Sequence, residues 1–592
     1  MNLNKPWRIF IEDRNYASWR LYDLDTKEEA SYDIMNTVKF NPAEKKLFNN
    51  DVIYETGELM YSYLRDCPSL AGIIMLENSK TYGRTENKKR LLYKCIPDDK
   101  RLPAFLIPYD MKLGFSKNIK DKYVVFKFES WSETHPHGLL LEVIGDSDNL
   151  EAFYEYKLYC RNLNITNKDF NKKTHKLFQP EKTEDYVQKI LQNPAFTIEN
   201  RTEEYVFTID PKNSTDFDDG FSIKTTPEGT TIISVYIANV FFWLESFDLW
   251  SSFTKRVSTI YLPDRRRPML PTILSDNLCS LLEKQPRFAF CMDLEYTNLD
   301  SQPNISFSNV LIRVKRNFVY EESALLKNKN YQTLLQKTQE LQSKTENSHD
   351  VVAYWMVYMN TKCGDYMFEN KIGIYRSIFS KTLSHIVSSG TTIHSIIDSD
   401  STINTETKRF LHNWNSVSGQ YMVFSEDANV GHELMNLPSY VHITSPIRRL
   451  VDLLNQMLFF SHFSLVKTLS SSAQAFLQGW LHEIEFINER MRSTMKVERE
   501  CEIIRKCLSS PEILEKIHEA YIIDIRELNI EPHQYKYLLY LEKDRMILSM
   551  KSEQKKDIYK KYKVKLYKID SYGVASKIKV GFYSEEVTTI IE

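Results

Sequence analysis

The sequence Asp210-Pro-Lys-Asn-Ser-Thr-Asp216-Phe-Asp218-Asp219-Gly220 places four carboxylates within ten residues. Segments of β character flank it, Glu204–Ile209 before and Phe221–Ile223 after, so we expect a loop between two strands. Carboxylates this close repel one another unless a cation holds them together, and hard divalent cations bind carboxylate oxygens. A pair of such ions about 4 Å apart is a common device for cleaving phosphodiesters. The stretch therefore predicts a metal-dependent nuclease or phosphotransferase, with a solvated acidic turn as the alternative.

The EF-hand calcium loop is one metal site that this stretch does not fit. Such a loop has Gly at its sixth position and Glu at its twelfth. Counting from Asp216, Gly220 is fifth and Pro227 is twelfth. A calcium loop of this type is therefore excluded.

The composition is that of an ordinary protein of several domains, since 592 residues exceed what one core organises. The net charge of −2 gives no overall attraction for a polyanion, so a nucleic-acid surface has to be a local basic patch. Eight cysteines without a CxxC pair argue against zinc modules and disulfides and for a reducing compartment. The most apolar run, Leu453–Val466, contains Asn455 and His462, so we expect no membrane span and a cytoplasmic protein.

Short β-type runs between residues 101 and 145, among them Tyr123–Trp131 and Gly138–Gly145, are broken by turn residues. This spacing is typical of a small barrel. Small barrels of the OB type commonly bind single-stranded nucleic acid on an aromatic and basic face. On composition alone, a barrel whose aromatic residues are only structural is the more favoured interpretation.

The C-terminal residues 515–592 return to β character and contain five strand-like segments, which predict another small barrel. Lysines alternate there with tyrosines, as in Lys555, Tyr559, Lys560, Lys561 and Tyr562. Positive charge for phosphates beside aromatic faces for bases is what a single-strand binder needs. A solvated basic surface is the alternative. Between the barrels, Leu450–Val466 and Ala473–Lys506 predict two long helices.

The second informative stretch is Tyr440-Val-His-Ile-Thr-Ser-Pro-Ile-Arg-Arg449. Pro446 is suited to open a helix, with Ser445 or Thr444 as its cap. A helix N-terminus beside Arg448 and Arg449 predicts a phosphate site.

Together, the two stretches resemble the RNB family of exoribonucleases, of the bacterial RNase II and eukaryotic Dis3 type. Further matches lie between them in the family's order: Ser258-Thr-Ile-Tyr-Leu-Pro-Asp-Arg265, Pro268-Met-Leu-Pro271, Leu274–Leu281, Arg287, Met356–Asn360 and Ile374-Tyr-Arg376. Upstream, Arg101-Leu-Pro and His135-Pro-His-Gly resemble the second cold-shock domain of the Dis3 branch, and we expect no PIN domain.

The resemblance implies an α+β multidomain fold with one or two N-terminal OB-type cold-shock barrels, a central RNB catalytic domain and a C-terminal S1-like OB barrel. The expected ranges are 1–90 for a reduced first cold-shock domain, 91–165 for the second, 195–508 for the RNB domain and 515–592 for the S1-like barrel.

The resemblance also implies a 3′→5′ hydrolase that degrades single-stranded RNA to nucleoside 5′-monophosphates with Mg²⁺, for which Mn²⁺ can substitute. It assigns metal binding to Asp210, Asp216, Asp218 and Asp219, with Asp218 essential for hydrolysis and Arg448 neutralising charge on the scissile phosphate. RNA contacts are expected from Tyr261, Arg449, Ser445, Asn360 and Arg376. We expect a monomer that binds single-stranded RNA and no membrane; the sequence does not identify partners in an RNA-decay complex.

Several positions depart from the family pattern. The block that usually reads HIADVS is Tyr236-Ile-Ala-Asn-Val-Phe241, Gly220 replaces a common Ala, and Ala353 and Tyr354 stand where acidic residues are usual. An RNA-binding or scaffold protein of the same fold, with weak or no nuclease activity, is therefore the main alternative. A metal-dependent DNA nuclease or phosphatase would not explain the flanking barrels.

Overall fold

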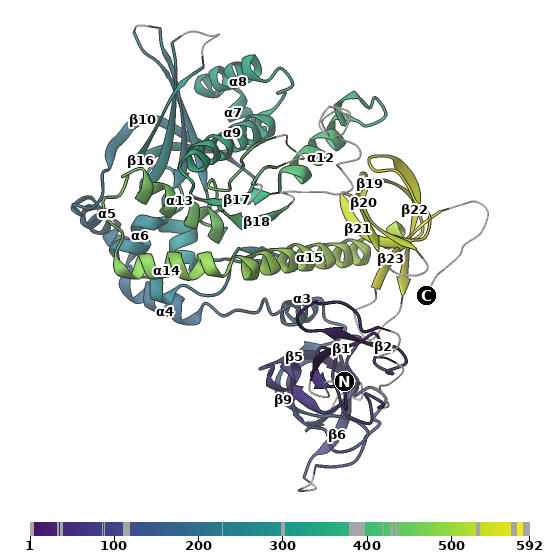
Figure 1. Ribbon diagram of the computed structural model, residues 1–592. Helices are drawn as coiled ribbons and strands as arrows, with labels where there is room; N and C mark the ends of the chain where they lie inside the picture. The colour runs from purple at the N-terminus through teal and green to yellow at the C-terminus, as the bar shows by residue number, and fades with distance from the viewer. Residues whose placement is uncertain are drawn as a thin grey trace.

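The computed structural model describes residues 5–31, 35, 40–85, 87, 89–110, 119–227, 229–297, 302–377, 397–417, 419–426, 430–432, 435, 437–528, 533–569 and 577–583. Figure 1 shows an N-terminal β unit, a large mixed body and a C-terminal sheet, with the long helix α15 (Ile484–Ser509) running from the body to that sheet. The α+β multidomain fold expected from the sequence is confirmed.

The chain begins with a small antiparallel sheet of order β2-β1-β3-β4. Its strands are β1 (Pro6–Ile11), β2 (Trp19–Asp23), β3 (Val52–Tyr54) and β4 (Leu59–Tyr61). Alternate residues of β1, namely Trp7, Ile9 and Ile11, are buried, as expected for a strand with one face on a core. The short helix α2 (Tyr63–Asp66) follows.

A closed barrel of order β5-β6-β7-β9-β8 comes next. Its strands are β5 (Leu70–Ile74), β6 (Leu91–Pro97), β7 (Phe105–Tyr109), β8 (Lys122–Ser130) and β9 (His137–Asp146). The boundary expected at residue 91 falls inside this barrel, because β5 pairs with both β6 and β8 and so closes it. The barrel therefore begins at Leu70.

Three helices lead from this barrel to the large body: α3 (Leu150–Cys160), α4 (Lys168–Leu177) and α5 (Thr183–Leu191). The Asn149 side chain caps α3 by accepting a hydrogen bond from the Ala152 backbone amide. Val497, Cys501 and Ile504 of α15 belong to the same hydrophobic cluster as α3 and the barrel. The charged pattern of α15 therefore hides a buried face, which joins the N-terminal unit to the body.

The body is built on a second closed barrel, of order β10-β11-β12-β15-β16. Its strands are β10 (Glu199–Asp210), β11 (Asp219–Thr225), β12 (Thr231–Ala238), β15 (Pro286–Tyr296) and β16 (Asn304–Val319). The acidic stretch connects β10 to β11, as the flanking β segments predicted.

Helices and short strands pack around this barrel and share one large hydrophobic core with it. They are α6 (Phe241–Ser246), α7 (Ser323–Leu326), α8 (Lys329–Leu341), α9 (Ser348–Glu369), β17 (Ile374–Ser377), β18 (Gln420–Val423), α13 (Leu450–His462) and α14 (Ser471–His482). The short strands β13 (Ile260–Tyr261) and β14 (Arg266–Arg267) pair with each other, and Ile260 belongs to the cluster of α3 and α15. The single helix expected over Ala473–Lys506 was wrong, since α14 ends at His482 and α15 begins at Ile484. Among the described residues, no helix is long and apolar enough to cross a membrane.

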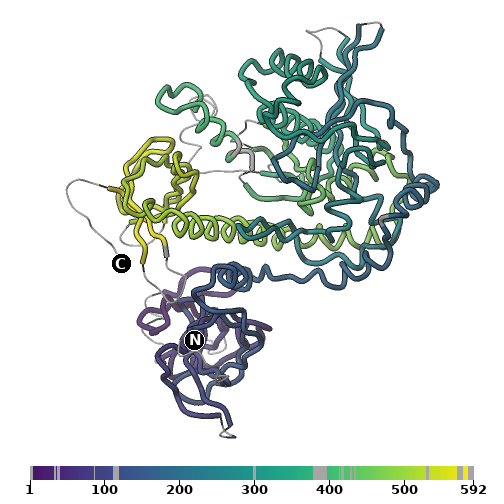
Figure 2. Tube along the Cα trace, turned by 180° about the vertical axis from the view of Figure 1, so that it is seen from behind, coloured from purple at the N-terminus to yellow at the C-terminus, as the bar shows by residue number. Residues whose placement is uncertain are grey.

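The C-terminal sheet has the order β21-β20-β19-β22-β23, and Figure 2 shows it rolled into a ring. Its strands are β19 (Ile517–Leu528), β20 (Gln534–Leu541), β21 (Met546–Ser552), β22 (Lys561–Ile569) and β23 (Lys577–Phe582), which confirms the five predicted strands.

Helix α12 (Thr405–Val417) lies between the body and the C-terminal sheet (Figure 1). The Phe410 ring stacks on Tyr540, with 3.6 Å between ring centroids, and Tyr559 is buried in the same cluster. Lys560 forms an ion pair with Asp400, 2.9 Å apart. Part of the lysine- and tyrosine-rich surface predicted to bind RNA is therefore used to dock α12.

Candidate active site

The acidic loop is held in place from behind by the segment that follows β14. Phe217 donates its backbone N–H to Ser280 Oγ (2.9 Å), and its carbonyl accepts from the Leu281 amide (3.0 Å). Buried Arg287 donates to the Ser280 carbonyl (2.7 Å). The Leu274–Leu281 and Arg287 signatures thus position the loop rather than line the site.

The loop faces the 445–449 turn, more than two hundred residues later in the chain. Asp218 Oδ1 accepts the Ile447 backbone N–H at 3.0 Å, and Asp218 Oδ2 lies 3.0 Å from Arg448 Nε. The Asp218 carbonyl also accepts the Ala238 amide at 2.8 Å, which ties the loop to the end of β12. Asp218 is thus the carboxylate that joins the two predicted stretches.

The helix expected to open at Pro446 was wrong. Residues 446–448 form a turn, Arg449 is extended (φ −135°, ψ 126°), and α13 begins only at Leu450. The reason is a bridge to a distant segment, because Thr259 N–H donates to the Arg448 carbonyl and Leu450 N–H donates to the Val257 carbonyl, both at 2.9 Å. The turn presents the Ile447 amide and the Arg448 guanidinium to Asp218 without a helix N-terminus.

Burial makes three of the four carboxylates hard to ionise. It raises the pKa of Asp218 to about 8, although the Arg448 charge and the Ile447 N–H act in the opposite direction. Burial likewise raises the pKa of Asp219 to about 6. The pKa of Asp210 lies well above its ordinary value, first because of burial and then because of the Asp219 charge. A group of acids in this state favours either protons or a cation.

The unpaired oxygens of this cluster fit a divalent cation. Asp210 Oδ2 and Asp219 Oδ2 are buried and accept no hydrogen bond from the described residues. The other two acids are paired with arginines, Asp216 with Arg266 at 2.7 Å and Asp218 with Arg448. Within the described ranges, no three acid, His or Cys side chains are preassembled as a metal site. Binding a metal through all four carboxylates therefore requires Arg266 to release Asp216 and Arg448 to release Asp218.

Tyr261 on β13 borders the same site. Its hydroxyl donates to Asp216 Oδ2 (3.3 Å), and its backbone N–H donates to Glu498 Oε1 (2.7 Å). The residue is 46% exposed, so an aromatic face is open beside the carboxylates. This position suits a ring that stacks on a base.

The other predicted RNA contacts lie deeper in the protein. Asn360 (4% exposed) accepts the Ile443 amide at 3.0 Å, and Arg376 (3% exposed) lies over the Tyr421 ring, 4.6 Å from its centroid. Ser445 is buried, and its Oγ accepts from Arg448 Nη2 at 3.1 Å. Asn360 and Ser445 brace the segment that carries Arg448, and Arg376 packs on β18. An RNA contact for these three residues stays a prediction.

Arg449 pairs with Asp452 rather than with Asp218, the partner of Arg448. Its Nη2 donates at 2.9 Å to Asp452 Oδ1, which also accepts the Ser445 amide at 2.7 Å. Asp452 is fully buried. Arg449 therefore anchors the turn to α13, and its predicted grip on the RNA backbone stays a prediction.

The sequence did not single out two features of the site. Arg266, which pairs with both Asp216 and Asp276, belongs to the basic run Arg265–Arg267, whose charge was a usable signal. Tyr320 follows β16, donates its amide to the Asp210 carbonyl (3.1 Å) and stacks on His349 with 3.7 Å between ring centroids. No sequence pattern marks that pair.

Two of the departures from the family pattern, Tyr236 and Asn239, fall on interior positions. The Tyr236 hydroxyl donates to Glu204 Oε2 at 2.7 Å, and Asn239 Nδ2 donates to Asn309 Oδ1 at 3.0 Å. Both residues are buried, so these substitutions are satisfied within the protein.

Comparison with known families identifies the fold. A model described as RNB domain matches residues 199–346 and 324–464, and one described as Dis3-like cold-shock domain 2 matches residues 92–156. The chain belongs to the RNB family. The first match contains both the acidic loop and the 445–449 turn, and the second contains most of the first closed barrel.

Curated relatives match part of the chain. Ribonuclease R of Aquifex aeolicus is 28% identical over 255 residues, covering 40% of this chain and 34% of that protein. DIS3-like exonuclease 2 of Xenopus tropicalis is 25% identical over 256 residues, covering 42% of this chain and 29% of the relative. The matched segments span about a third of the length of these two relatives.

Solved structures extend the likeness in fold over nearly the whole chain. RNase R of Mycoplasma genitalium, in complex with ribose-methylated single-stranded RNA, aligns with a TM-score of 0.67 and 17% identity over 97% of this chain and 99% of that one. The yeast pseudonuclease Ssd1 aligns with a TM-score of 0.56 and 12% identity over 92% and 81% of the two chains. The fold by itself therefore does not decide activity.

Proposed function

We propose that this RNB protein is a Mg²⁺-dependent 3′→5′ exoribonuclease that hydrolyses single-stranded RNA to nucleoside 5′-monophosphates. The observation that supports it best is the pairing of the two stretches, in which the 445–449 turn brings Arg448 against Asp218 of the acidic loop, beside Asp210 and Asp219. Asp210 and Asp219 have buried oxygens with no hydrogen bond from the described residues. Buried carboxylates that lack hydrogen-bond donors cost folding free energy, and groups of this kind are typical of catalytic sites.

The residues that would hold the metal are Asp210, Asp216, Asp218 and Asp219. A divalent ion there supplies a bound water of lowered pKa and offsets negative charge at the scissile phosphate. Mn²⁺ carries the same charge and also binds oxygen ligands, so we expect it to substitute.

Asp218 and Arg448 act together on the phosphate. The Ile447 N–H fixes the orientation of the Asp218 carboxylate. The Arg448 side chain is 46% exposed, so its guanidinium reaches both Asp218 and the open side of the site. When the carboxylates bind a cation, Arg448 can turn to a substrate phosphate and stabilise the charge that develops there.

Substrate choice follows from the surfaces around the site. Tyr261 offers a stacking face, which tolerates any base, and the 2′-OH is what distinguishes RNA from DNA. We further propose that the protein acts as a monomer in the cytoplasm, with single-stranded RNA as its partner.

The second candidate is an RNA-binding or scaffold protein of the same fold without nuclease activity. The fold shared with the pseudonuclease Ssd1 supports it, as does the pairing of Asp216 and Asp218 with arginines. The presence of all four aspartates and of Arg448 favours the enzyme.

Degradation of a 5′-labelled single-stranded RNA distinguishes the two candidates. We expect a ladder that shortens from the 3′ end with Mg²⁺ and is lost with EDTA. Asp218→Asn should abolish the ladder while RNA binding persists. Intact RNA in the presence of Mg²⁺ would favour the scaffold, and equal attack on DNA would contradict ribonuclease specificity.

A further inference from the structure

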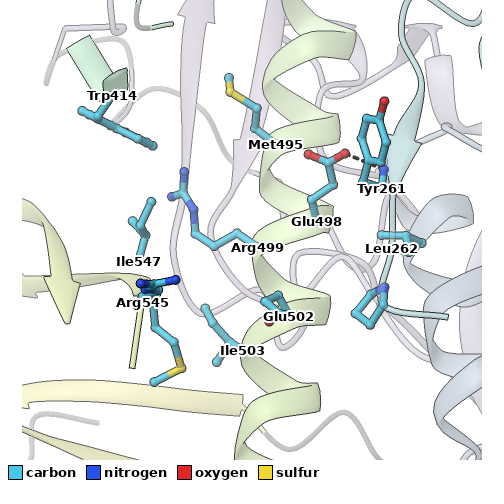
Figure 3. Close-up of a pocket in the computed structure, with 12 residues that line it drawn as sticks. Tyr261, Leu262, Trp414, Met495, Glu498, Arg499, Glu502, Ile503, Arg545 and Ile547 are labelled. Carbon is cyan, nitrogen blue, oxygen red and sulfur yellow. Dashed lines mark hydrogen bonds between the residues drawn. The ribbon is translucent and has the colours of Figure 1, made fainter. Parts of the chain in front are cut away.

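A cavity of about 480 Å³ lies beside the acidic site, between the body and the C-terminal sheet. Figure 3 shows its wall: Tyr261 and Leu262 on one side, α15 along the centre, and Trp414 and Ile547 on the other. A volume of this order accommodates a nucleotide-sized ligand. Tyr261 belongs to both spaces, so the cavity adjoins the site that the carboxylates form.

Arg499 of α15 points into this cavity and toward Trp414 (Figure 3). Its guanidinium lies 5.6 Å from the centroid of the Trp414 ring, but it makes no ion pair or hydrogen bond with the described part of the chain. Burial lowers the pKa of Arg499 below its ordinary value. A guanidinium carries five N–H donors, so this one is positioned to receive an anion.

Other charged groups of α15 have partners in the protein. Arg505 is held by Glu502 at 2.6 Å, and Arg490 donates to the Arg161 carbonyl at 2.9 Å. Glu498, also in the cavity wall, accepts the Tyr261 backbone N–H. The two acidic residues of the wall, Glu498 and Glu502, thus already have hydrogen-bond or ion-pair partners, while Arg499 has none among the described residues.

The aromatic wall of the cavity is held rigidly. Trp414 is on α12, which is fixed to the C-terminal sheet by the Phe410–Tyr540 stack and by an ion pair between Glu406 and Arg545. A ring held in this way can stack on a base without losing much conformational freedom on binding.

We propose that the cavity binds a nucleoside phosphate of the RNA strand, with the phosphate on Arg499 and the base on Trp414. This subsite rests on the proposed function, and it lies upstream of the nucleotide beside Tyr261. It recognises any base, because both contacts are independent of base identity. A released nucleoside 5′-monophosphate carries the same base and phosphate groups as a nucleotide of the strand. The experiment distinguishes the bound strand from the released product.

Binding is measured on the full chain carrying Asp218→Asn, in EDTA, with 5′-labelled single-stranded RNAs of increasing length. Arg499→Gln should lower the affinity for the longer RNAs several-fold. It should also reduce the slope of log affinity against log salt by about 0.7, which is the effect of one lost phosphate contact on a single strand. RNAs too short to reach the cavity should bind as before. Lys176→Gln, which removes one exposed charge from α4, is the matched control and should leave the slope unchanged.

Trp414→Ala should weaken the longer RNAs about tenfold, while Trp414→Phe retains most of the affinity, because a stacking face remains. Unchanged affinity and slope in both Arg499→Gln and Trp414→Ala would overturn the proposal. Unchanged RNA binding together with weakened binding of a nucleoside 5′-monophosphate, measured on the same chain, would place the released product there and overturn the assignment to the strand. Because binding is measured without cleavage, a lack of nuclease activity contradicts only the proposed function.

Discussion

The two closed barrels each bury an aspartate at the end of a strand, yet they treat it differently. In the first barrel, Asp121 (4% exposed) precedes β8, and its Oδ1 accepts the amides of Leu76 (2.6 Å) and Glu77 (2.9 Å). In the second barrel, Asp219 (8% exposed) opens β11, and its Oδ2 accepts no hydrogen bond from the described residues. A buried carboxylate is therefore a structural element in one barrel and a candidate ligand in the other.

The difference lies in what satisfies the charge. Two backbone amides that donate to one carboxylate lock the connection between strands, as those of Leu76 and Glu77 do with Asp121 between β5 and β8. Without such donors, burial favours the neutral form, which is the origin of the raised pKa of Asp219. Hydrogen-bond satisfaction, rather than burial, separates the two roles.

The largest effect should come from replacing one buried aspartate at each barrel. Asp218→Asn should reduce the rate of RNA hydrolysis roughly 10³-fold or more, because a metal ligand beside the scissile phosphate is lost, and should leave the fold intact. Asp121→Ala should leave the rate per folded molecule unchanged and destabilise the protein by about 1–3 kcal/mol, since the buried Leu76 amide and the Glu77 amide lose their acceptor. Single-turnover kinetics and urea unfolding measure the two. Equal loss of rate in both variants would contradict the comparison.

Substitutions of the adjacent residues Arg448 and Arg449 should likewise affect different quantities, the hydrolysis rate for Arg448 and the stability for Arg449. Arg448→Gln should slow hydrolysis by about 10²- to 10³-fold, as expected when a group that stabilises developing charge is removed. Arg449→Gln should chiefly lower stability, by about 3–5 kcal/mol, because it leaves buried Asp452 without its cation.

Rates and unfolding curves of both arginine variants, measured at one temperature where each is folded, check this prediction. Arg448→Lys serves as control, since it keeps the charge and should recover part of the rate. A pure stability loss in Arg448→Gln would show that Arg448 is only structural.

The parts of the fold with local signals could be predicted from the sequence. The segments Tyr123–Trp131 and Gly138–Gly145 lie on β8 and β9, because strand character depends on neighbouring residues. The helix expected at Pro446 was wrong because a bridge from residues 257–259 holds Arg449 extended, and local propensity does not contain that contact.

The site shows the same limit. The four aspartates were found because they are close together in the sequence. The partners that decide their state, Arg266 and the Ile447 amide, come from other segments and are selected only by folding. Nor does sequence distinguish Asp219 from Asp121, since what differs is the supply of backbone amides around each carboxylate.

Mg²⁺ should stabilise the chain in a pH-dependent manner. The cation competes with protons on Asp218 and Asp219, whose pKa values are raised to about 8 and about 6, so its effect should grow as the pH rises. With free Mg²⁺ about 100-fold above its Kd, we expect about 2–3 kcal/mol of stabilisation near pH 8 and much less near pH 5. Unfolding curves with Mg²⁺ and with EDTA provide the measurement. Asp219→Asn should reduce the increment and Asp121→Ala should not, whereas an increment independent of pH would exclude these carboxylates as ligands.

Glu498 is intermediate between the two aspartates and should show the smallest effect. It accepts one backbone N–H, from Tyr261, and burial still raises its pKa to about 7. Because the folded state holds this proton more tightly than the unfolded chain, the stability that Glu498 contributes is present below about pH 4.5 and is lost as the pH rises through 7. Glu498→Gln carries no such proton, so in EDTA its stability should gain on the parent chain by roughly 2 kcal/mol between pH 4.5 and 8. Parallel pH profiles of the two chains would mean that one backbone amide already satisfies this carboxylate as fully as two satisfy Asp121.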